Sequence, residues 1–201
     1  GKKTTIFAGI GAKDAREEVL EIAQRLKAPI VHTSRAKDFF DYNNPYNMGM
    51  TGMLGLEPGF KAVKNCEILL LLGTDFAWPQ FFPENCIIIQ VDHCATAIGK
   101  RHPVGLGVIG GVKETLRQVL PQLQPQSNDA FLVEHQQHYA KEIAKQNFLD
   151  RGAESSLIHP QYLVQLLSKY ASQDAIFTAD GGSAMVWMLR HIEVNGQRRT
   201  L

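Results

Sequence analysis

Apolar residues in this chain gather in short unbroken runs instead of alternating with polar residues. The clearest run covers residues 68–72 and ends at Gly73. A half-exposed strand alternates, because its side chains point to opposite faces, so an unbroken run indicates a strand covered on both faces. We therefore predict a central strand of a parallel sheet here. Thr74 and Asp75 would lie at its carboxyl end.

The first part of the chain has the pattern of a strand, a helix and a second strand. Residues 3–8 and 29–32 predict the strands, and apolar residues at helical spacing predict a helix at 15–26. We expect Asp14 to cap this helix, with Glu17 completing a capping box. Together the three elements predict a βαβ unit.

Further apolar segments extend this alternation. Residues 86–91 and 106–109 predict two more strands, and 58–65 and 112–123 predict helices. The stretch 34–56 is rich in Asn, Pro and Gly, so we expect a long loop containing at most a short strand. Five or six strands alternating with helices predict an α/β fold: a doubly wound, Rossmann-like, six-stranded parallel sheet.

A polar linker at 124–128 is the clearest domain boundary. Residues 129–148 predict a polar surface helix, and we expect a loop at 150–156. A helix after Pro160, a strand and another helix then predict the beginning of a second α/β domain. We expect the chain to be a segment of a longer polypeptide. It divides into a domain at 1–124, a linker with a connecting helix at 125–158, and the start of a second domain at 159–201.

Composition and charge exclude several classes of protein. Hydrophobic residues make up 44% of the chain and charged residues 20%, which is typical of a folded globular protein. A net charge of +1 gives no electrostatic reason to expect nucleic acid or a membrane as partner. No signal peptide or membrane-length apolar run is visible, and the 3 cysteines lack a Cys-x-x-Cys pair. We therefore expect a cytoplasmic protein with reduced thiols.

Candidate binding residues lie where the predicted strands end, because ligands of open α/β sheets bind outside the carboxyl ends. Gly9 and Gly11 follow the first strand, but Asp14 replaces the third glycine of a dinucleotide fingerprint, so we do not expect an NAD site. The glycines at 49–52 would let backbone approach a ligand closely, or simply shape a connection. Aromatic residues at 76–85 would line a pocket or an interface, or form a small local core.

Three further groups each have two interpretations. The sequence Asp92-His93-Cys94 resembles a metal cluster, but no second set of ligands lies at suitable spacing, so a turn or a ribose contact is favoured. His135 and His138 lie on a predicted surface helix without acidic partners, which is a weak metal site. The Gly-Gly-Ser stretch at 181–183 precedes a helix and would form either a phosphate cradle or an ordinary turn.

Taken together and in order, several motifs resemble those of the pyruvate oxidase branch of the thiamine-diphosphate-dependent enzymes. Each motif is short, but the resemblance extends over essentially the whole chain. The motifs are residues 28–32, 44–46, 49–52, 72–74, 87–92, 98–102, 158–162 and 180–182, together with Trp187.

The resemblance implies that the chain is the central domain of such an enzyme plus the opening of its last domain. The cofactors it implies are FAD, thiamine diphosphate and magnesium, with the metal site beyond Leu201. The parent enzyme would carry out oxidative decarboxylation of pyruvate and would assemble as a homodimer or homotetramer. The catalytic glutamate of the family belongs to a domain that precedes this segment, so the segment alone is expected to be inactive.

Transferred residue by residue, the resemblance also implies the binding residues. Thiamine diphosphate would contact Gly182 and Ser183. FAD would contact Gly9, Gly11, Gly49, Met50, Thr51, Gly52, Gly73, Thr74, Asp75, Phe76, Asp92, His93, Cys94, Ala95 and Thr96.

One departure from the family pattern affects the flavin. Gly111 stands where the family typically has an aspartate that binds the adenine end of FAD, and losing that partner costs about 1.5–3 kcal/mol. One alternative is an acetolactate-synthase-like or other 2-oxo-acid decarboxylating enzyme, because domains outside this segment decide the substrate. Another is a central domain that is a flavin-free structural spacer, which Gly111 favours. A stand-alone nucleotide-binding module is a third alternative.

Overall fold

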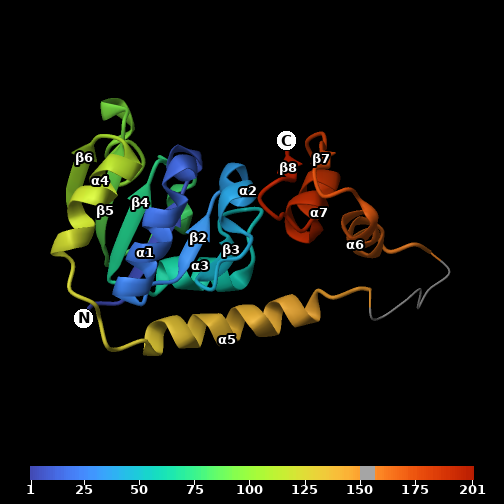
Figure 1. Cartoon of the computed structure of the whole chain (residues 1–201), viewed down its shortest axis with the longest axis horizontal. Helices are drawn as coiled ribbons and strands as arrows, with labels where there is room; N and C mark the ends of the chain where they lie inside the picture. Colours follow the sequence, from blue (N-terminus) through green and yellow to red (C-terminus); the bar gives the residue numbers. More distant parts are fainter. Residues whose placement is uncertain (150–156) are drawn as a thin grey trace.

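A six-stranded parallel sheet forms the body of the molecule (Figure 1). The computed structural model describes residues 1–149 and 157–201, so the predicted loop at 150–156 lies outside the described residues. The strand order is β3-β2-β1-β4-β5-β6, which confirms the doubly wound α/β fold. The strands are β1 Thr4–Ala8, β2 Ile30–His32, β3 Asn47–Met50, β4 Ile68–Leu72, β5 Ile87–Asp92 and β6 Leu106–Ile109.

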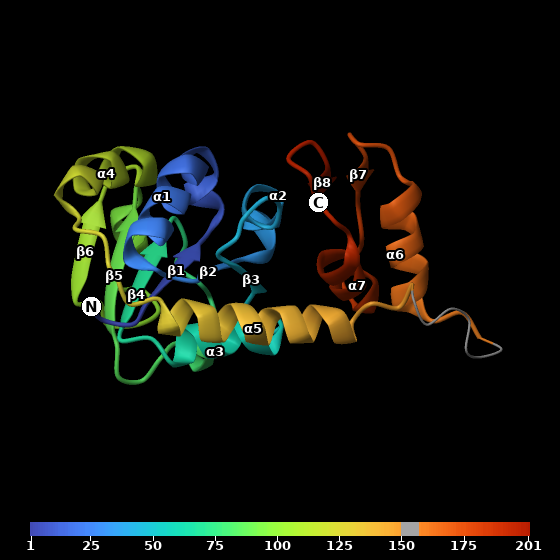
Figure 2. The ribbon, with the colours of Figure 1, turned by 60° about the horizontal axis from the view of Figure 1, so that its bottom comes forward.

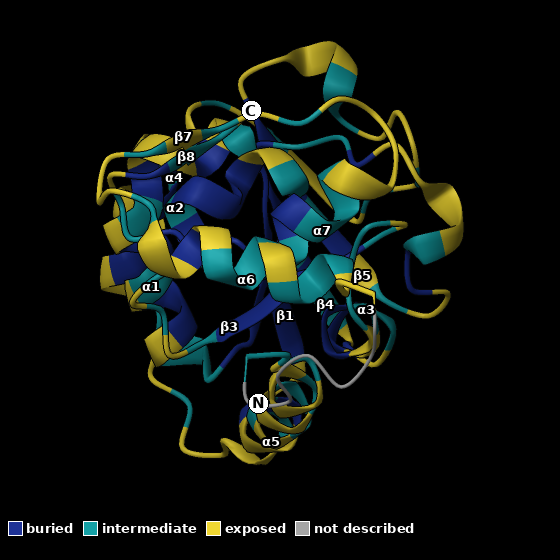
Figure 3. Ribbon diagram, turned by 90° about the vertical axis from the view of Figure 1, so that its right-hand side faces the viewer, coloured by how far each residue is buried: buried dark blue, intermediate teal, exposed yellow. Residues whose placement is uncertain are grey.

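Helices cover both faces of this sheet (Figures 1 and 3). One core packs Ile6 and Leu72 against α1 and α4, and the other packs Phe7 and Leu71 beneath α3 and α5. Successive residues of β1 and β4 thus enter opposite cores, which confirms the two-sided burial predicted from the apolar run. The helices are α1 Arg16–Leu26, α2 Lys37–Phe40, α3 Glu57–Lys64, α4 Val112–Val119 and α5 Ala130–Lys145. The 3₁₀ turns are η1 Ile10–Ala15, η2 Ser34–Ala36, η3 Pro79–Phe81, η4 Ala95–Ala97 and η5 Leu120–Gln122.

The described residues after α5 form a small second unit. It contains α6 Pro160–Tyr170, β7 Ile176–Phe177, α7 Ser183–His191 and β8 Arg199–Thr200, and β7 and β8 pair in parallel. Helix α5 lies alongside α3 and extends from the body toward this unit (Figure 2). The backbone N–H and Oγ1 of Thr200 both donate hydrogen bonds to the Asp38 carboxylate, which holds β8 against α2.

Three expectations about local structure are wrong. Helix α1 begins at Arg16 and Asp14 lies within η1, so there is no Asp14 capping box. The stretch 34–56 contains the short strand that the sequence allowed, as β3, but it also contains the helix α2, so the rest of it is not all loop. Helix α5 is not purely a surface helix, because its residues Leu132 and His135 are buried.

None of the described helices is both long enough and apolar enough to cross a membrane.

Candidate functional site

A cleft of about 680 Å³ opens at the carboxyl edge of the sheet, where the strand order reverses between β1 and β4. This is the position at which open α/β sheets bind ligands, and the volume is within the roughly 300–1,000 Å³ of small-molecule sites. The residues that line it are Ile10, Gly11, Thr33, Ser34, Arg35, Met50, Thr51, Met53, Leu54, Gly73, Thr74, Asp75, Phe76, Ala77, Trp78, Asp92, His93, Ala97 and Met185.

Glycines let two turns meet at the floor of this cleft. The Gly11 N–H donates a 3.0 Å hydrogen bond to the Gly73 carbonyl, and the Gly9 N–H donates one of 2.8 Å to the Leu72 carbonyl. Gly73 has φ +63°, and a Cβ at that position would lie 2.5 Å from the Gly11 backbone. A side chain would therefore both strain the backbone and push the turns apart.

The chain after Gly73 is held in an unusual conformation. Phe76 has φ +35°, which is uncommon for a residue other than glycine. The Thr74 Oγ1 accepts a 3.1 Å hydrogen bond from the Phe76 N–H, and the Phe76 ring packs edge-on against Phe7 with centroids 4.6 Å apart. Packing of the ring in the core thus maintains the bent backbone that forms one wall of the cleft.

Gln90 in β5 connects two loops of the cleft. Its side chain is buried, and its Nε2 donates hydrogen bonds to the carbonyls of Thr74, at 3.2 Å, and Ala97, at 3.1 Å. Its Oε1 accepts a 2.9 Å hydrogen bond from the Gly99 N–H. One amide therefore fixes the loop after β4 and the loop after β5 relative to each other.

Two polar groups in the cleft have no partner among the described residues. The Thr51 Oγ1 is buried without a hydrogen bond, and burying an unpaired hydroxyl is unfavourable. The Arg35 guanidinium, which follows β2, likewise makes no ion pair or hydrogen bond within residues 1–149 and 157–201. The Asp75 carboxylate, by contrast, is 3.2 Å from Arg101 and 3.8 Å from Lys100.

The structure brings most of the predicted FAD residues together. Nine of them line the cleft: Gly11, Met50, Thr51, Gly73, Thr74, Asp75, Phe76, Asp92 and His93.

The remaining predicted residues lie outside the lining. Gly9 packs directly against the Gly73 turn. A Cβ on Gly49 would contact Tyr139 of α5, and a Cβ on Gly52 would contact Phe76. Gly182 and Ser183 are exposed at the start of α7, and only Met185 of this helix reaches the cleft. The predicted contacts Cys94, Ala95 and Thr96 follow the cleft residues Asp92 and His93 but do not themselves line it.

Sequence reasoning missed several lining residues. Thr33, Ser34 and Arg35 follow β2 at its carboxyl end, so the strand-end rule applied to them too. No sequence pattern indicated that Met185 would line the cleft, because this residue belongs to the second unit and not to a strand end of the sheet. In the aromatic loop, Trp78 is 43% exposed and lines the cleft, whereas Phe82 is buried in the core, so the expectation holds for only part of that loop.

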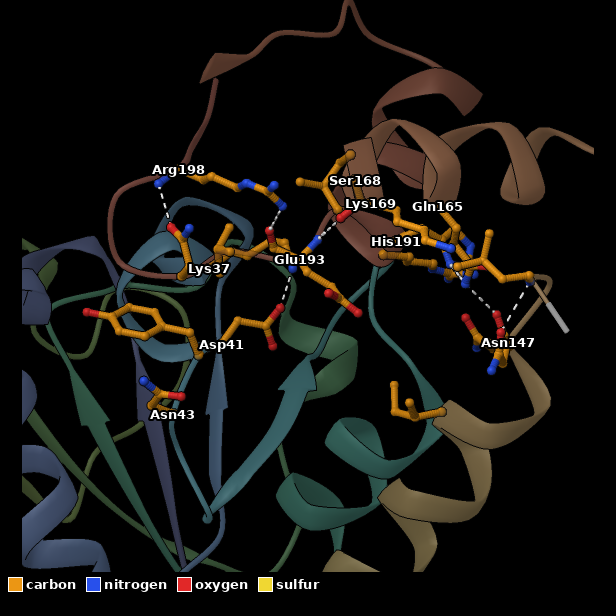
Figure 4. Close-up of a pocket in the computed structure, with 18 of the residues that line it drawn as sticks. Lys37, Asp41, Asn43, Asn147, Gln165, Ser168, Lys169, His191, Glu193 and Arg198 are labelled. Atoms are coloured by element: carbon orange, nitrogen blue, oxygen red, sulfur yellow. Dashed lines mark hydrogen bonds and ion pairs between the residues drawn. The ribbon is translucent and has the colours of Figure 1, made fainter. Parts of the chain in front are cut away.

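A second pocket, of about 810 Å³, lies between α2, the end of α5 and the second unit (Figure 4). Burial acts to raise the pKa of Asp41, but Lys37 and His32 hold that pKa well below its usual range. The Asn47 amide also donates a 2.6 Å hydrogen bond to Asp41. The Arg198 guanidinium, on the opposite side, donates to backbone carbonyls including that of Glu193. Because these charges already have partners, the cleft at the sheet edge is the stronger candidate site.

No three His, Cys, Asp or Glu residues in the described part of the chain are grouped so that they could hold a metal ion.

Residues 1–119 match the family described as "Thiamine pyrophosphate enzyme, central domain". The chain belongs to this family. It is 34% identical over 200 residues to a putative thiamine pyrophosphate-containing protein, YdaP, of Bacillus subtilis, an alignment that covers 98% of this chain and 34% of the relative.

Two other relatives are named for different activities. The acetolactate synthase large subunit of Cyanidium caldarium is 29% identical over 202 residues, covering 96% of this chain and 34% of the relative. The pyruvate oxidase of Lactiplantibacillus plantarum is 23% identical over 201 residues, covering 98% and 33%. The chain thus spans about a third of the length of these relatives.

Proposed function

We propose that this chain is a segment of a thiamine-diphosphate- and FAD-dependent pyruvate oxidase and that its cleft binds the FAD. The unpaired Thr51 hydroxyl carries the proposal, because a buried donor without a partner in a ligand-sized cleft is satisfied when a polar ligand enters. The likeness to a pyruvate oxidase and the motifs spread along the whole chain support the choice of reaction.

The cleft residues fit the parts of a flavin dinucleotide. Arg35 offers a planar cation suited to the diphosphate, and Asp92, at the end of β5, offers a carboxylate suited to ribose hydroxyls. Trp78 and Met53 supply exposed apolar surface for a ring system. A bound flavin supplies two-electron chemistry, while this chain binds the flavin, orients it and excludes water.

In the same proposal, thiamine diphosphate would contact Gly182 and Ser183. The start of α7 is open, because no atom of the described residues, chain neighbours apart, lies within 4 Å of a Cβ placed on Gly181 or Gly182. Magnesium would be held outside this segment. Pyruvate would be the substrate of the parent enzyme.

Titration of FAD with the purified chain, followed by quenching of flavin fluorescence, tests the flavin proposal. We expect saturable binding that Thr51→Val weakens by up to about tenfold, since a neutral hydrogen bond contributes roughly 0.5–1.5 kcal/mol. Arg35→Gln should weaken binding about tenfold to a hundredfold, since a charged hydrogen bond contributes roughly 1.5–3 kcal/mol.

Arg117→Gln is the matched control for Arg35, because it removes a guanidinium from α4 that pairs with Glu18 outside the cleft. This variant should bind FAD as the unaltered chain does. Absence of binding by a chain that circular dichroism shows to be folded would overturn the proposal, as would equal losses in the Arg35 and Arg117 variants.

The second candidate is an acetolactate-synthase-like or other 2-oxo-acid decarboxylating enzyme whose central domain is a flavin-free spacer. Gly111 favours it, and a side chain at that position would overlap the Glu114 carboxylate. Gly111→Asp alone would therefore place two carboxylates side by side. If a flavin site exists, Gly111→Asp with Glu114→Gln should tighten FAD binding, whereas a spacer would bind FAD in neither variant.

We also propose that the parent enzyme is a homodimer or homotetramer and that this segment self-associates more weakly. Exposed apolar side chains on β6 and α6 support an interface there, among them Ile109, Leu167 and Tyr170. Sedimentation of the segment as a tight tetramer would contradict the weaker association.

A further inference from the structure

Two cysteines are in contact at the opposite end of the sheet from the cleft. Cys66 lies just before β4 and Cys86 just before β5, so both are at the amino ends of adjacent strands. Their Sγ atoms are 3.7 Å apart, and both are free thiols. The cleft residues Gly73 and Asp92 lie at the carboxyl ends of the same two strands.

The backbone around the pair suits a disulfide bond. Ile68 is the register partner of Ile87, and the Ile87 N–H donates a 2.9 Å hydrogen bond to the Glu67 carbonyl. Cys66 and Cys86 therefore lie in the neighbouring segments that lead into these two adjacent strands. Their Sγ atoms, 3.7 Å apart, need to approach by less than about 2 Å to reach the S–S bond length of roughly 2.0 Å.

The two thiols differ in the way that a peroxide-reactive pair requires. Cys86 is partly exposed, and the hydrogen bond from Cys66 lowers the pKa of the Cys86 thiol. The same contact and then burial raise the pKa of Cys66, which is only 4% exposed. Because the thiolate is the nucleophile, Cys86 is placed to react first and Cys66 to resolve the product.

We propose that Cys66 and Cys86 form a modification site that hydroperoxides convert to a disulfide. The Cys86 thiolate attacks one oxygen of hydrogen peroxide and breaks the O–O bond, which leaves a sulfenic acid and hydroxide. The Cys66 thiol then attacks the sulfenic sulfur, the S–S bond forms, and water leaves. In total the two thiols lose two electrons and two protons, and the peroxide becomes two waters. Exchange with a thiol reductant restores the pair.

Cys94 provides an internal control for this chemistry. It is exposed, and its Sγ lies 3.1 Å from the Thr96 hydroxyl, not near a thiol. Strand β5, Ile87–Asp92, separates Cys94 from Cys86 by about 20 Å of extended chain. Peroxide that reaches Cys94 should therefore stop at the sulfenic acid, which dimedone traps.

Peptide mapping after mild peroxide treatment tests the site. Free thiols are blocked with N-ethylmaleimide, and cleavage after Glu67, Glu84 and Asp92 places Cys66, Cys86 and Cys94 on three separate peptides. We expect these two peptides to be joined and to separate on reduction, while Cys94 carries dimedone. Cys66→Ser should leave a dimedone adduct on Cys86, and Cys86→Ser should leave Cys66 unoxidised.

Two outcomes would overturn the proposal. One is that Cys66 and Cys86 are both recovered with the maleimide while Cys94 is oxidised. The other is that Cys86 stops at the dimedone-reactive stage in the unaltered chain. The unaltered chain decides the question even if a serine variant does not fold, and FAD binding does not enter the measurement.

Discussion

The Gln90 side chain donates a 3.2 Å hydrogen bond to the backbone carbonyl of Thr74, so a buried residue of β5 holds the loop that follows β4. The same amide also contacts Ala97 and Gly99 in the loop after β5. No cofactor contact is needed for this role. Gln90 instead determines how far apart two walls of the cleft lie.

Replacing Gln90 with Leu should therefore destabilise the chain and loosen the cleft. Each buried backbone group left without a partner costs about 1–3 kcal/mol. We expect urea denaturation to show a lower free energy of unfolding and the FAD titration to show weaker binding. Gln122→Leu is the control, because the Gln122 amide is exposed and donates a hydrogen bond to the neighbouring Gln118 carbonyl on the surface. Equal stability of the two variants would show that Gln90 does not hold the loops.

Gly73→Ala should be far more damaging than Gly181→Ala. Gly73 combines φ +63° with backbone atoms 2.5 Å from where a Cβ would lie, whereas nothing lies within 4 Å of a Cβ on Gly181. Left-handed backbone alone costs about 1–2 kcal/mol for a residue with a Cβ, and displacement of the Gly11 turn adds to it. Thermal unfolding measures the difference, and similar melting temperatures would contradict the close approach.

Stability should fall as the pH drops below about 6.5. Burial lowers the pKa of His135, whose two ring nitrogens have no hydrogen-bond partner among the described residues, and lowers the pKa of His191 to about 4. The unfolded chain binds these protons first, so the stabilisation is complete above the unfolded pKa. As the pH falls from the unfolded pKa toward each folded pKa, the free energy of unfolding decreases by up to about 1.4 kcal/mol per pH unit for each histidine.

His135→Leu tests this pH dependence, because it removes one of the two groups. Denaturation at a series of pH values should show a shallower loss of stability on acidification. His93→Gln is the control, because it removes a histidine whose side chain is 81% exposed instead of buried. An identical slope in the His135 variant and the unaltered chain would mean that His135 does not contribute.

Arg190→Gln should weaken cofactor binding although Arg190 does not line the cleft. Its guanidinium donates hydrogen bonds to the carbonyls of Leu54, at 3.0 Å, and Gly55, at 2.9 Å, and Leu54 lines the cleft. Losing this contact should weaken FAD binding about tenfold, because α7 then no longer holds that wall. Lys169→Gln in α6 is the control in the same titration, and an equal loss there would indicate general damage to the second unit.

The type of fold and the position of most of the cleft follow from the order of residues alone. Unbroken apolar runs such as 68–72 identify buried parallel strands, because only a strand covered on both faces has no polar side. The order of strands and helices then places Gly11, Thr74 and Asp92 at carboxyl ends, and these ends meet at one edge of the sheet.

Tertiary structure decided what local pattern does not encode. Asp14 is of a residue type that commonly caps helices, but η1 continues past it and α1 begins two residues later, at Arg16. His135 has the pattern of a surface residue and is buried because α5 packs on α3. Met185 of the second unit lines the cleft, and Arg190 of the same unit donates a hydrogen bond to Leu54 in the cleft wall. The thiols of Cys66 and Cys86 meet at the amino ends of adjacent strands. Such contacts join residues far apart in sequence, so they exist only once the sheet has brought its strands together.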